Sequence, residues 1–378
     1  MTTLSRSADL LKELIAFPTI SRTSNLALIA HVAALLEGAG IACEWVKDEA
    51  GTCANLFAST GPEGVPGILL SGHTDVVPVA GQAWTTEPFE ASLREGRIYG
   101  RGAADMKGFV ACAVIAMLDA AARPLRKPLQ LALSYDEEIG CVGVRRLIGM
   151  LEQAALRPEL CVVGEPTMMQ IATGHKGKAA YRALCCGQEG HSALAPRYVN
   201  AIHVAADLVG GMRAVQQTLA DQGARDEGYD VPYSTIHVGT INGGKALNIV
   251  PNQCVLDFEI RTLAADRPAD ILGQVLERVP RDNGFAPEIE EMNTYPGLET
   301  NAASDAVRFI ESLLPAGTGK RKVAFGTEGG LFSTRLSTPT VVCGPGDIDV
   351  AHKPDEYVSL DQLDACDAFL ARLTGRLV

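Results

Sequence analysis

The hydrophobic positions along the chain repeat in two ways that predict different elements. Apolar residues recur at helical spacing over 10–16 and 26–36, and further helical stretches cover 106–122 and 142–151. Between them lie short apolar runs without clean alternation, each followed closely by polar residues or glycine, as in strands buried on both faces. These runs are 68–70, 129–133, 160–163 and 340–343. Strands that alternate with helices predict an α/β fold with a mostly parallel sheet and helices on both faces.

The middle of the chain has a different pattern. Strand-like segments at 179–185, 234–241 and 254–260 surround a helical stretch at 201–215 and a polar loop at 220–229. The α/β pattern returns afterwards, which predicts a smaller α+β domain inserted into a larger one. The predicted domains are a catalytic domain in two parts, 1–174 and 285–378, and an inserted domain, 175–284.

Composition narrows the classes of function. A formal net charge of −12 argues against a nucleic-acid or anionic-membrane surface, which needs clustered lysine and arginine. No apolar run approaches the roughly 18 residues of a membrane helix, and the first seven residues lack the features of a signal peptide. The ten cysteines are scattered, without a Cys-x-x-Cys motif. We therefore expect a cytoplasmic protein with reduced thiols and no nucleic-acid or membrane partner.

Each predicted buried strand is followed by histidine or carboxylate residues, and a further aspartate precedes a helix. These residues are His73, Asp75, Asp105, Glu137, Glu138, Glu165 and His352. Because ligands in open α/β sheets bind beyond the carboxyl ends of the strands, we expect these side chains to converge. So many carboxylates need a positive charge nearby, and histidine with carboxylates suits zinc or a similar divalent metal. Two ions that share a carboxylate fit this set better than one.

The adjacent residues Glu137 and Glu138 predict a division of tasks. Successive side chains of an extended segment point in opposite directions, so one can bind metal while the other acts as general base. Asp75 would share a face with His73 and could accept its ring proton. A single carboxylate at such a position is otherwise a loop residue or a helix cap, as Asp105 would be.

Several motifs resemble those of the M20 metallopeptidase family, also called the aminoacylase or acetylornithine deacetylase/succinyl-diaminopimelate desuccinylase family. The resemblance covers essentially the whole chain. The motifs are SGHTDVVP at 71–78, GRGAADMKG at 100–108, DEE at 136–138, GEP at 164–166 and AHKPDE at 351–356. The resemblance implies two divalent metal ions as cofactors, zinc or alternatively cobalt.

The resemblance also implies how the metal ligands divide. Asp105 would bridge both ions. His73 and Glu165 would complete the first site, and Glu138 and His352 would complete the second. Some relatives carry aspartate where Glu165 stands, and the glutamate favours a deacylase over a peptidase.

Further roles follow from the same resemblance. Glu137 would be the general base, and Asp75 would hold the histidine of the first site. His191, in a Gly-His-Ser motif of the inserted domain, would reach the active site of a partner subunit and stabilise the oxyanion. Asn248 and Arg261 would hold the substrate carboxylate. The inserted domain resembles the family's lid or dimerisation domain, which implies a homodimer.

Two segments point to one branch of the family. FGTEGGLF at 325–332 and CGPGDI at 343–348 resemble the acetylornithine deacetylase branch. Thr327 and Glu328 are then expected at the substrate, with Glu328 facing the ammonium group of ornithine; an exposed loop glutamate is the alternative. The implied reaction is hydrolysis of N-acetylornithine to ornithine and acetate in arginine biosynthesis.

Three other interpretations remain. The nearest is another amidohydrolase of the family, such as a succinyl-diaminopimelate desuccinylase, an acetylcitrulline deacetylase, an aminoacylase or a small carboxypeptidase. The second is a non-catalytic metal- or amino-acid-binding protein, against which the intact Glu137 argues. The third is an interaction protein, which would not need a complete ligand set.

Overall fold

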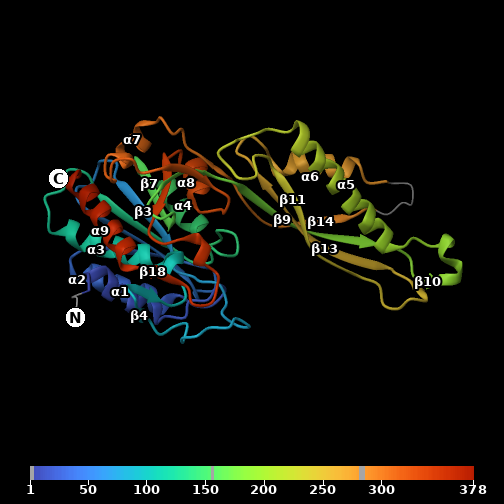
Figure 1. The fold of residues 1–378 in the computed structure, drawn as a ribbon, viewed down its shortest axis with the longest axis horizontal. Coiled ribbons are helices and arrows are strands. Elements are labelled where there is room, and N and C mark those ends of the chain that lie inside the picture. The colour runs from blue at the N-terminus through green and yellow to red at the C-terminus, as the bar shows by residue number, and fades with distance from the viewer. Residues whose placement is uncertain (1–3, 155–156, 281–285) are drawn as a thin grey trace. The chain divides into compact units, whose positions relative to one another are not determined.

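The computed structural model describes residues 4–154, 157–280 and 286–378, and its contacts divide the chain into two compact units (Figure 1). The first unit comprises Met1–Gly174, Leu298–Lys322 and Thr327–Val378, and the second comprises His175–Gly297 and Val323–Gly326. The predicted boundary between 284 and 285 lies outside the described residues. The assignment of the second unit as a lid domain stays a prediction.

The first unit is the predicted α/β fold, built on a sheet that has nine strands among the described residues. Its strands run in the order β1-β2-β6-β3-β7-β17-β8-β15, and β16 pairs with β8. The central strands β6, β3, β7 and β17 are parallel, whereas β1, β2 and β8 are antiparallel to their neighbours. The strands are β1 Cys43–Lys47, β2 Ala54–Thr60, β3 Ile68–His73, β6 Leu129–Ser134, β7 Leu160–Pro166, β8 Ile171–His175, β15 Leu298–Glu299, β16 Lys320–Val323 and β17 Thr340–Gly344.

Helices cover both faces of this sheet, which explains why the four parallel strands are mostly apolar and do not alternate between apolar and polar residues (Figure 1). Helices α1, α3 and α9 pack against one another on one face, and α4 and α8 pack together on the other. Serine side chains cap two of them: Ser5 accepts from Ala8 N at α1, and Ser359 accepts from Gln362 N at α9. The helices are α1 Arg6–Ile15, α2 Leu26–Gly38, α3 Gly108–Ala121, α4 Val144–Gln153, α7 Asp305–Glu311, α8 Gly329–Leu336 and α9 Leu360–Gly375.

Short elements connect the sheet to its helices. The strands β4 Ser92–Arg94, β5 Arg97–Tyr99 and β18 Tyr357–Ser359 form a small antiparallel sheet. The helical turns are η1 Ala103–Lys107 and η3 Ile348–Val350. The turn η1 leads directly into α3, so the end of the small sheet and the start of α3 are adjacent along the chain. No helix in the described part of the chain has the length and apolar character needed to cross a membrane.

The second unit contains an antiparallel sheet in the order β11-β13-β9-β14, covered by α5 and α6 (Figure 1). Burial alternates along β9 and β13, so one face of the sheet forms a separate apolar core with the helices. Its elements are β9 Gly177–Cys186, β10 Gly190–His191, η2 Ser192–Arg197, α5 Ala201–Gln222, β11 Thr235–Gly243, β12 Ile249–Val250, β13 Gln253–Thr262, α6 Pro268–Glu277 and β14 Glu288–Tyr295.

Helix α5 is longer than the sequence pattern predicted. It continues to Gln222, so the start of the predicted loop at 220–229 is helical. The physical reason is that Met212, Val215 and Leu219 are all buried at helical spacing, which keeps one apolar face against the sheet beyond residue 215.

Candidate metal centre

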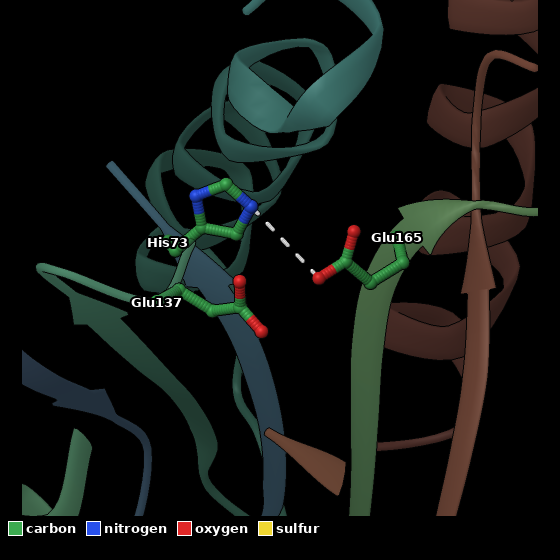
Figure 2. A group of neighbouring side chains, drawn as sticks. All are labelled: His73, Glu137 and Glu165. Carbon is green, nitrogen blue, oxygen red and sulfur yellow. Dashed lines mark ion pairs between the residues drawn. The ribbon is translucent and has the colours of Figure 1, made fainter. Parts of the chain in front are cut away.

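His73 lies at the end of β3, and Figure 2 shows its ring facing the carboxylate of Glu165. The Nε2 atom is 2.9 Å from Oδ1 of Asp105 and 3.8 Å from Oε1 of Glu165. All three side chains are buried. Glu165 belongs to β7, the parallel neighbour of β3, so the sheet places its side chain beside the histidine as the strand pattern predicted.

A second group forms around the other oxygen of Asp105. The Nε2 atom of His352 is 3.2 Å from Oδ2 of Asp105 and 3.0 Å from Oε2 of Glu138. Asp105 therefore faces a different histidine with each of its carboxylate oxygens. This geometry is the one that a carboxylate bridging two metal ions requires.

Asp75 connects the first histidine with the segment after β6. Nδ1 of His73 is 2.9 Å from the Asp75 carbonyl oxygen and 3.5 Å from Oδ1 of its carboxylate. The same carboxylate accepts hydrogen bonds from the backbone N–H groups of Glu137 and Glu138, and from the Ser21 hydroxyl. Asp75 thus orients the His73 ring and fixes the two glutamates.

The charges of this cluster depend on one another. Burial opposes ionisation of Asp105, but its hydrogen bonds with His352 and His73 hold its pKa well below the ordinary value. Hydrogen bonds to Asp105 and Glu138 raise the pKa of His352 to about 10. Burial raises the pKa of Glu138 to about 7, and burial also raises that of Glu165 well above its usual range. The protein therefore holds carboxylates that need added positive charge to stay ionised.

The donor set fits divalent metal ions. Single donor atoms of His73, Glu137 and Glu165 lie within 4.8 Å of one another, and so do those of His73, Asp105 and Glu138. Among the described residues, the ion pairs of Asp105, Glu138 and Glu165 are all with histidines. Imidazole nitrogen and carboxylate oxygen suit zinc and similar metals, whose charge would offset these carboxylates.

Glu137 lies beside His73 and Glu165 (Figure 2) and is only 9% exposed. Its Oε1 accepts a hydrogen bond from the Cys141 thiol, 3.2 Å away. Burial raises the pKa of Glu137 to about 8 in the metal-free chain. Distance alone does not separate a base from a ligand here, and the role of Glu137 stays a prediction.

Thr327 and Glu328 are both buried, at 0% and 1% exposure. The Thr327 hydroxyl accepts a hydrogen bond from Gly329 N at the start of α8. The Glu328 carboxylate accepts hydrogen bonds from Ser71 on β3, at 3.1 Å, and from Ser134 on β6. In this arrangement Glu328 faces two serine hydroxyls rather than solvent, unlike the exposed loop glutamate considered from the sequence. Its contact with a substrate ammonium group stays a prediction.

The remaining candidates belong to the second unit. His191 is exposed, and its Nδ1 accepts a hydrogen bond from Ala193 N, so its Nε2 carries the proton in the neutral ring. Asn248 is also exposed. Arg261 is partly buried, with Nε 3.0 Å from Oε1 of Glu259. All three residues belong to the second unit, whereas the candidate metal ligands belong to the first.

Sequence reasoning gave no role to several side chains that the structure places around the cluster. Arg101 and Glu356 form a buried ion pair of 2.7 Å, and Cys141, Ser71 and Ser134 donate to the buried glutamates. Arg101 and Glu356 both lie within motifs shared with the family, and this was the one feature of the sequence that could have indicated a role for them. Their pairing was not visible, since they are 255 residues apart in the sequence.

Comparisons with known proteins show the family and the fold. The sequence pattern of peptidase family M20/M25/M40 matches residues 69–376. The acetylornithine deacetylase of Myxococcus xanthus is 36% identical over 371 residues, which cover 96% of this chain and 95% of the relative. The M20 family metallo-carboxypeptidase Sso-CP2 from Sulfolobus solfataricus shares the fold, with a TM-score of 0.80, 20% identity and coverage of 98% of this chain and 99% of that chain.

A third comparison concerns the fold of a metal-binding relative. The YXEP protein of Bacillus subtilis, described as a dinuclear metal binding peptidase from the M20 family, aligns with a TM-score of 0.69 and 15% identity. The alignment covers 98% of this chain and 96% of that chain. At this level of identity the likeness concerns the fold of both units rather than their chemistry.

Proposed function

The chain belongs to peptidase family M20/M25/M40, and from this premise we propose that it is a dinuclear metal-dependent amidohydrolase that converts N2-acetyl-L-ornithine to L-ornithine and acetate. The convergence of two histidines and four carboxylates from five segments supports the reaction class. The 36% identity to a curated acetylornithine deacetylase, over nearly all of both chains, supports the substrate. The product ornithine would serve arginine biosynthesis.

The metal ligands in this proposal are the residues that meet at Asp105. His73 and Glu165 would hold one ion, Glu138 and His352 the other, and Asp105 both. Bound divalent metal, which we propose to be zinc, supplies Lewis acidity toward the acetyl carbonyl and lowers the pKa of water. Asp75 keeps the Nε2 atom of the first histidine directed at the ligand cluster.

The protein's own proton transfer centres on Glu137. Its carboxylate takes the proton of the attacking water and returns it to the departing nitrogen, so that ornithine leaves as an amine. The Cys141 thiol and the backbone contact between Glu137 N and Asp75 hold the side chain and its segment in place. No covalent bond between enzyme and substrate is needed.

Substrate binding in the proposal uses the second unit. The guanidinium of Arg261 would bind the α-carboxylate of the substrate, and Asn248 would donate a further hydrogen bond to it. His191 of the partner subunit would donate its Nε2 proton to the developing oxyanion. Thr327 and Glu328 are the proposed contacts on the first unit.

A homodimer completes the proposal. Strand β11 is the edge of its sheet, most of its residues are exposed, and the nearby Leu247 is fully exposed. An exposed edge strand with apolar neighbours is a ready site for another chain. The ten cysteines are free thiols, which supports a reducing compartment, and we propose the cytoplasm.

Steady-state hydrolysis tests the proposal directly. Metal-loaded and chelated protein would be compared on N-acetylornithine, N-succinyl-diaminopimelate, N-acetylcitrulline, N-acetylmethionine and a dipeptide. We expect metal-dependent turnover with the highest kcat/KM for N-acetylornithine. Preference for another substrate would overturn the substrate and keep the reaction class. Bound metal without turnover would overturn both.

A further inference from the structure

A buried ion pair connects the segments that carry Asp105 and His352, two of the candidate metal ligands. Arg101 and Glu356 are each 1% exposed, and Nη1 of Arg101 donates to Oε2 of Glu356 at 2.7 Å. Neither side chain has a part in the chemistry described above. We propose that Arg101 is a positioning residue that sets the affinity of the second metal site, because its guanidinium joins the segments carrying Asp105 and His352. The inference rests on the proposed dinuclear centre.

The first arm of this connection runs through Glu356 to Asp105. Oε2 of Glu356 accepts from Gly102 N at 3.0 Å, and Oε1 accepts from Ala104 N at 2.9 Å and from Asp105 N at 3.0 Å. Backbone N–H groups that converge on one anion fix the conformation of their segment. The carboxylate therefore determines where the Asp105 backbone lies, and Arg101 supplies the positive charge that makes its burial tolerable.

The second arm runs to His352. Nη2 of Arg101 donates to Oε1 of Gln82 at 2.5 Å, and Nε2 of Gln82 donates to the His352 carbonyl oxygen at 2.8 Å. Nη1 of Arg101 also donates to the Lys353 carbonyl oxygen at 3.3 Å. The ring of Trp84 lies 5.0 Å from the guanidinium carbon and orders it further.

His352 needs this support more than the other ligands do. Its backbone has a φ of 61°, a left-handed conformation that is strained for an L-residue. Its side chain is 51% exposed, whereas that of His73 is 1% exposed, so packing holds it less firmly. The hydrogen bonds to the His352 and Lys353 carbonyl oxygens therefore hold the backbone from which the ring projects toward Asp105 and Glu138.

A lysine at position 101 would not replace these contacts. The planar guanidinium reaches Glu356, Gln82 and the Lys353 carbonyl at once, whereas an ammonium group is a single point of charge. The Arg101→Lys variant keeps a positive charge beside Glu356, so we expect it to fold. It loses the guanidinium that contacts Glu356, Gln82 and the Lys353 carbonyl at the same time. Gln82→Ala keeps Arg101 and its ion pair with Glu356 and removes the link to His352, together with the acceptor of the Trp84 indole N–H, at a half-buried position.

The test is zinc binding to metal-free protein, measured by chelator competition and calorimetry, with unfolding temperature as a second readout. Loss of a group that orients a ligand typically weakens metal binding about 10–100-fold, and we expect that loss for the second ion in Arg101→Lys and Gln82→Ala. The first ion should bind as in the wild type. Arg335→Lys, which breaks a fork to Glu152 elsewhere in the same unit, is the matched control.

The outcomes separate this inference from the proposed function. Second-ion affinity equal to the wild type in both variants overturns the positioning role. Equal weakening of both ions also overturns it, because that pattern indicates general loosening. A wild-type protein that binds only one ion contradicts the dinuclear centre itself, and the inference with it.

Discussion

In the first unit the candidate metal ligands contact one another and all but His352 are largely buried, whereas in the second unit the candidate residues are exposed or paired locally. His73 and Asp105 are 2.9 Å apart at a strand end, whereas His191 accepts a hydrogen bond from Ala193 N in its own turn. Arg261 pairs with Glu259 on its own strand and donates to the Tyr295 hydroxyl of the same unit. The contrast follows from the folds, because buried parallel strands end at one rim while an antiparallel sheet covered on one face leaves half its side chains outside.

From this difference we expect the first unit to carry out the chemistry and the second to bind the substrate. A cluster of fixed side chains is organised before substrate arrives, which favours chemistry. Exposed side chains with local partners become part of a site only when a substrate or a second subunit approaches. Substitutions in the first unit should therefore change kcat or metal content, and those in the second should change KM or depend on the partner.

The largest expected effect is that of Glu137→Ala. Loss of a general base lowers kcat by about 10²–10⁴-fold, and the metal content should stay at two ions because Glu137 is proposed not to be a ligand. Turnover and metal content by mass spectrometry measure both. Loss of an ion would reassign Glu137 as a ligand. Glu159→Gln, an exposed glutamate paired with Lys127, is the control.

The second largest expected effect is that of His191→Ala. Removing an oxyanion donor lowers kcat by about 10²–10³-fold, with metal binding unchanged. A mixture of Glu137→Ala and His191→Ala chains decides where the histidine acts. If it acts in the partner subunit, each mixed dimer contains one intact site and activity returns.

The control for that experiment is a mixture of Glu137→Ala with the double variant. No mixed dimer in that sample has an intact site, so its activity should stay at the level of the separate variants. If the Glu137→Ala and His191→Ala mixture also stays inactive although mass spectrometry detects mixed dimers, His191 acts within its own chain. The second unit would then need no partner to complete the site.

Arg261→Lys should have a smaller effect, confined to binding. A hydrogen bond to a charged group contributes about 1.5–3 kcal/mol, so KM should rise roughly 10–100-fold with little change in kcat. Arg182→Lys is the matched control, because Arg182 makes a similar fork to Asp257 on the same sheet. A fall in kcat at unchanged KM would contradict a role in ground-state binding.

The sequence predicted most of the first unit because its central strands are short, mostly apolar runs that are followed by polar residues. His73 and Glu165 follow directly from that pattern, and the structure brings them together. The Arg101–Glu356 pair could not be predicted, since charge pattern within a motif does not indicate a partner 255 residues away.

The second unit was harder to predict for a related reason. Its strand-like segments were visible, but the exposed positions of His191 and Asn248 carry no packing signal. Only the resemblance to a family gave them a role. The environment of Glu328 was also hidden, because the serines that bind it belong to β3 and β6 and the sheet alone brings them to α8.

The smallest expected effect is that of substituting Glu328. This substitution tests whether the first unit also binds the ammonium group of the substrate. Burial raises the pKa of Glu328 to about 7 in the folded, metal-free chain, above the ordinary value of 4.5. The folded state then holds the proton more tightly than the unfolded state. The resulting stability is present below about pH 4.5 and is lost as pH rises through 7, by about 2 kcal/mol between pH 5 and 7.

Glu328→Gln removes this titration while keeping a side chain that can hydrogen-bond Ser71 and Ser134, so its metal-free stability should fall less between pH 5 and 7 than that of the wild type. Glu152→Gln is the control, because Arg335 lowers rather than raises the pKa of that half-buried carboxylate. The same variant addresses specificity. If Glu328 faces the substrate ammonium group, the preference for N-acetylornithine over N-acetylmethionine should drop; a full preference would contradict that contact and leave Glu328 as a buried link between the sheet and α8.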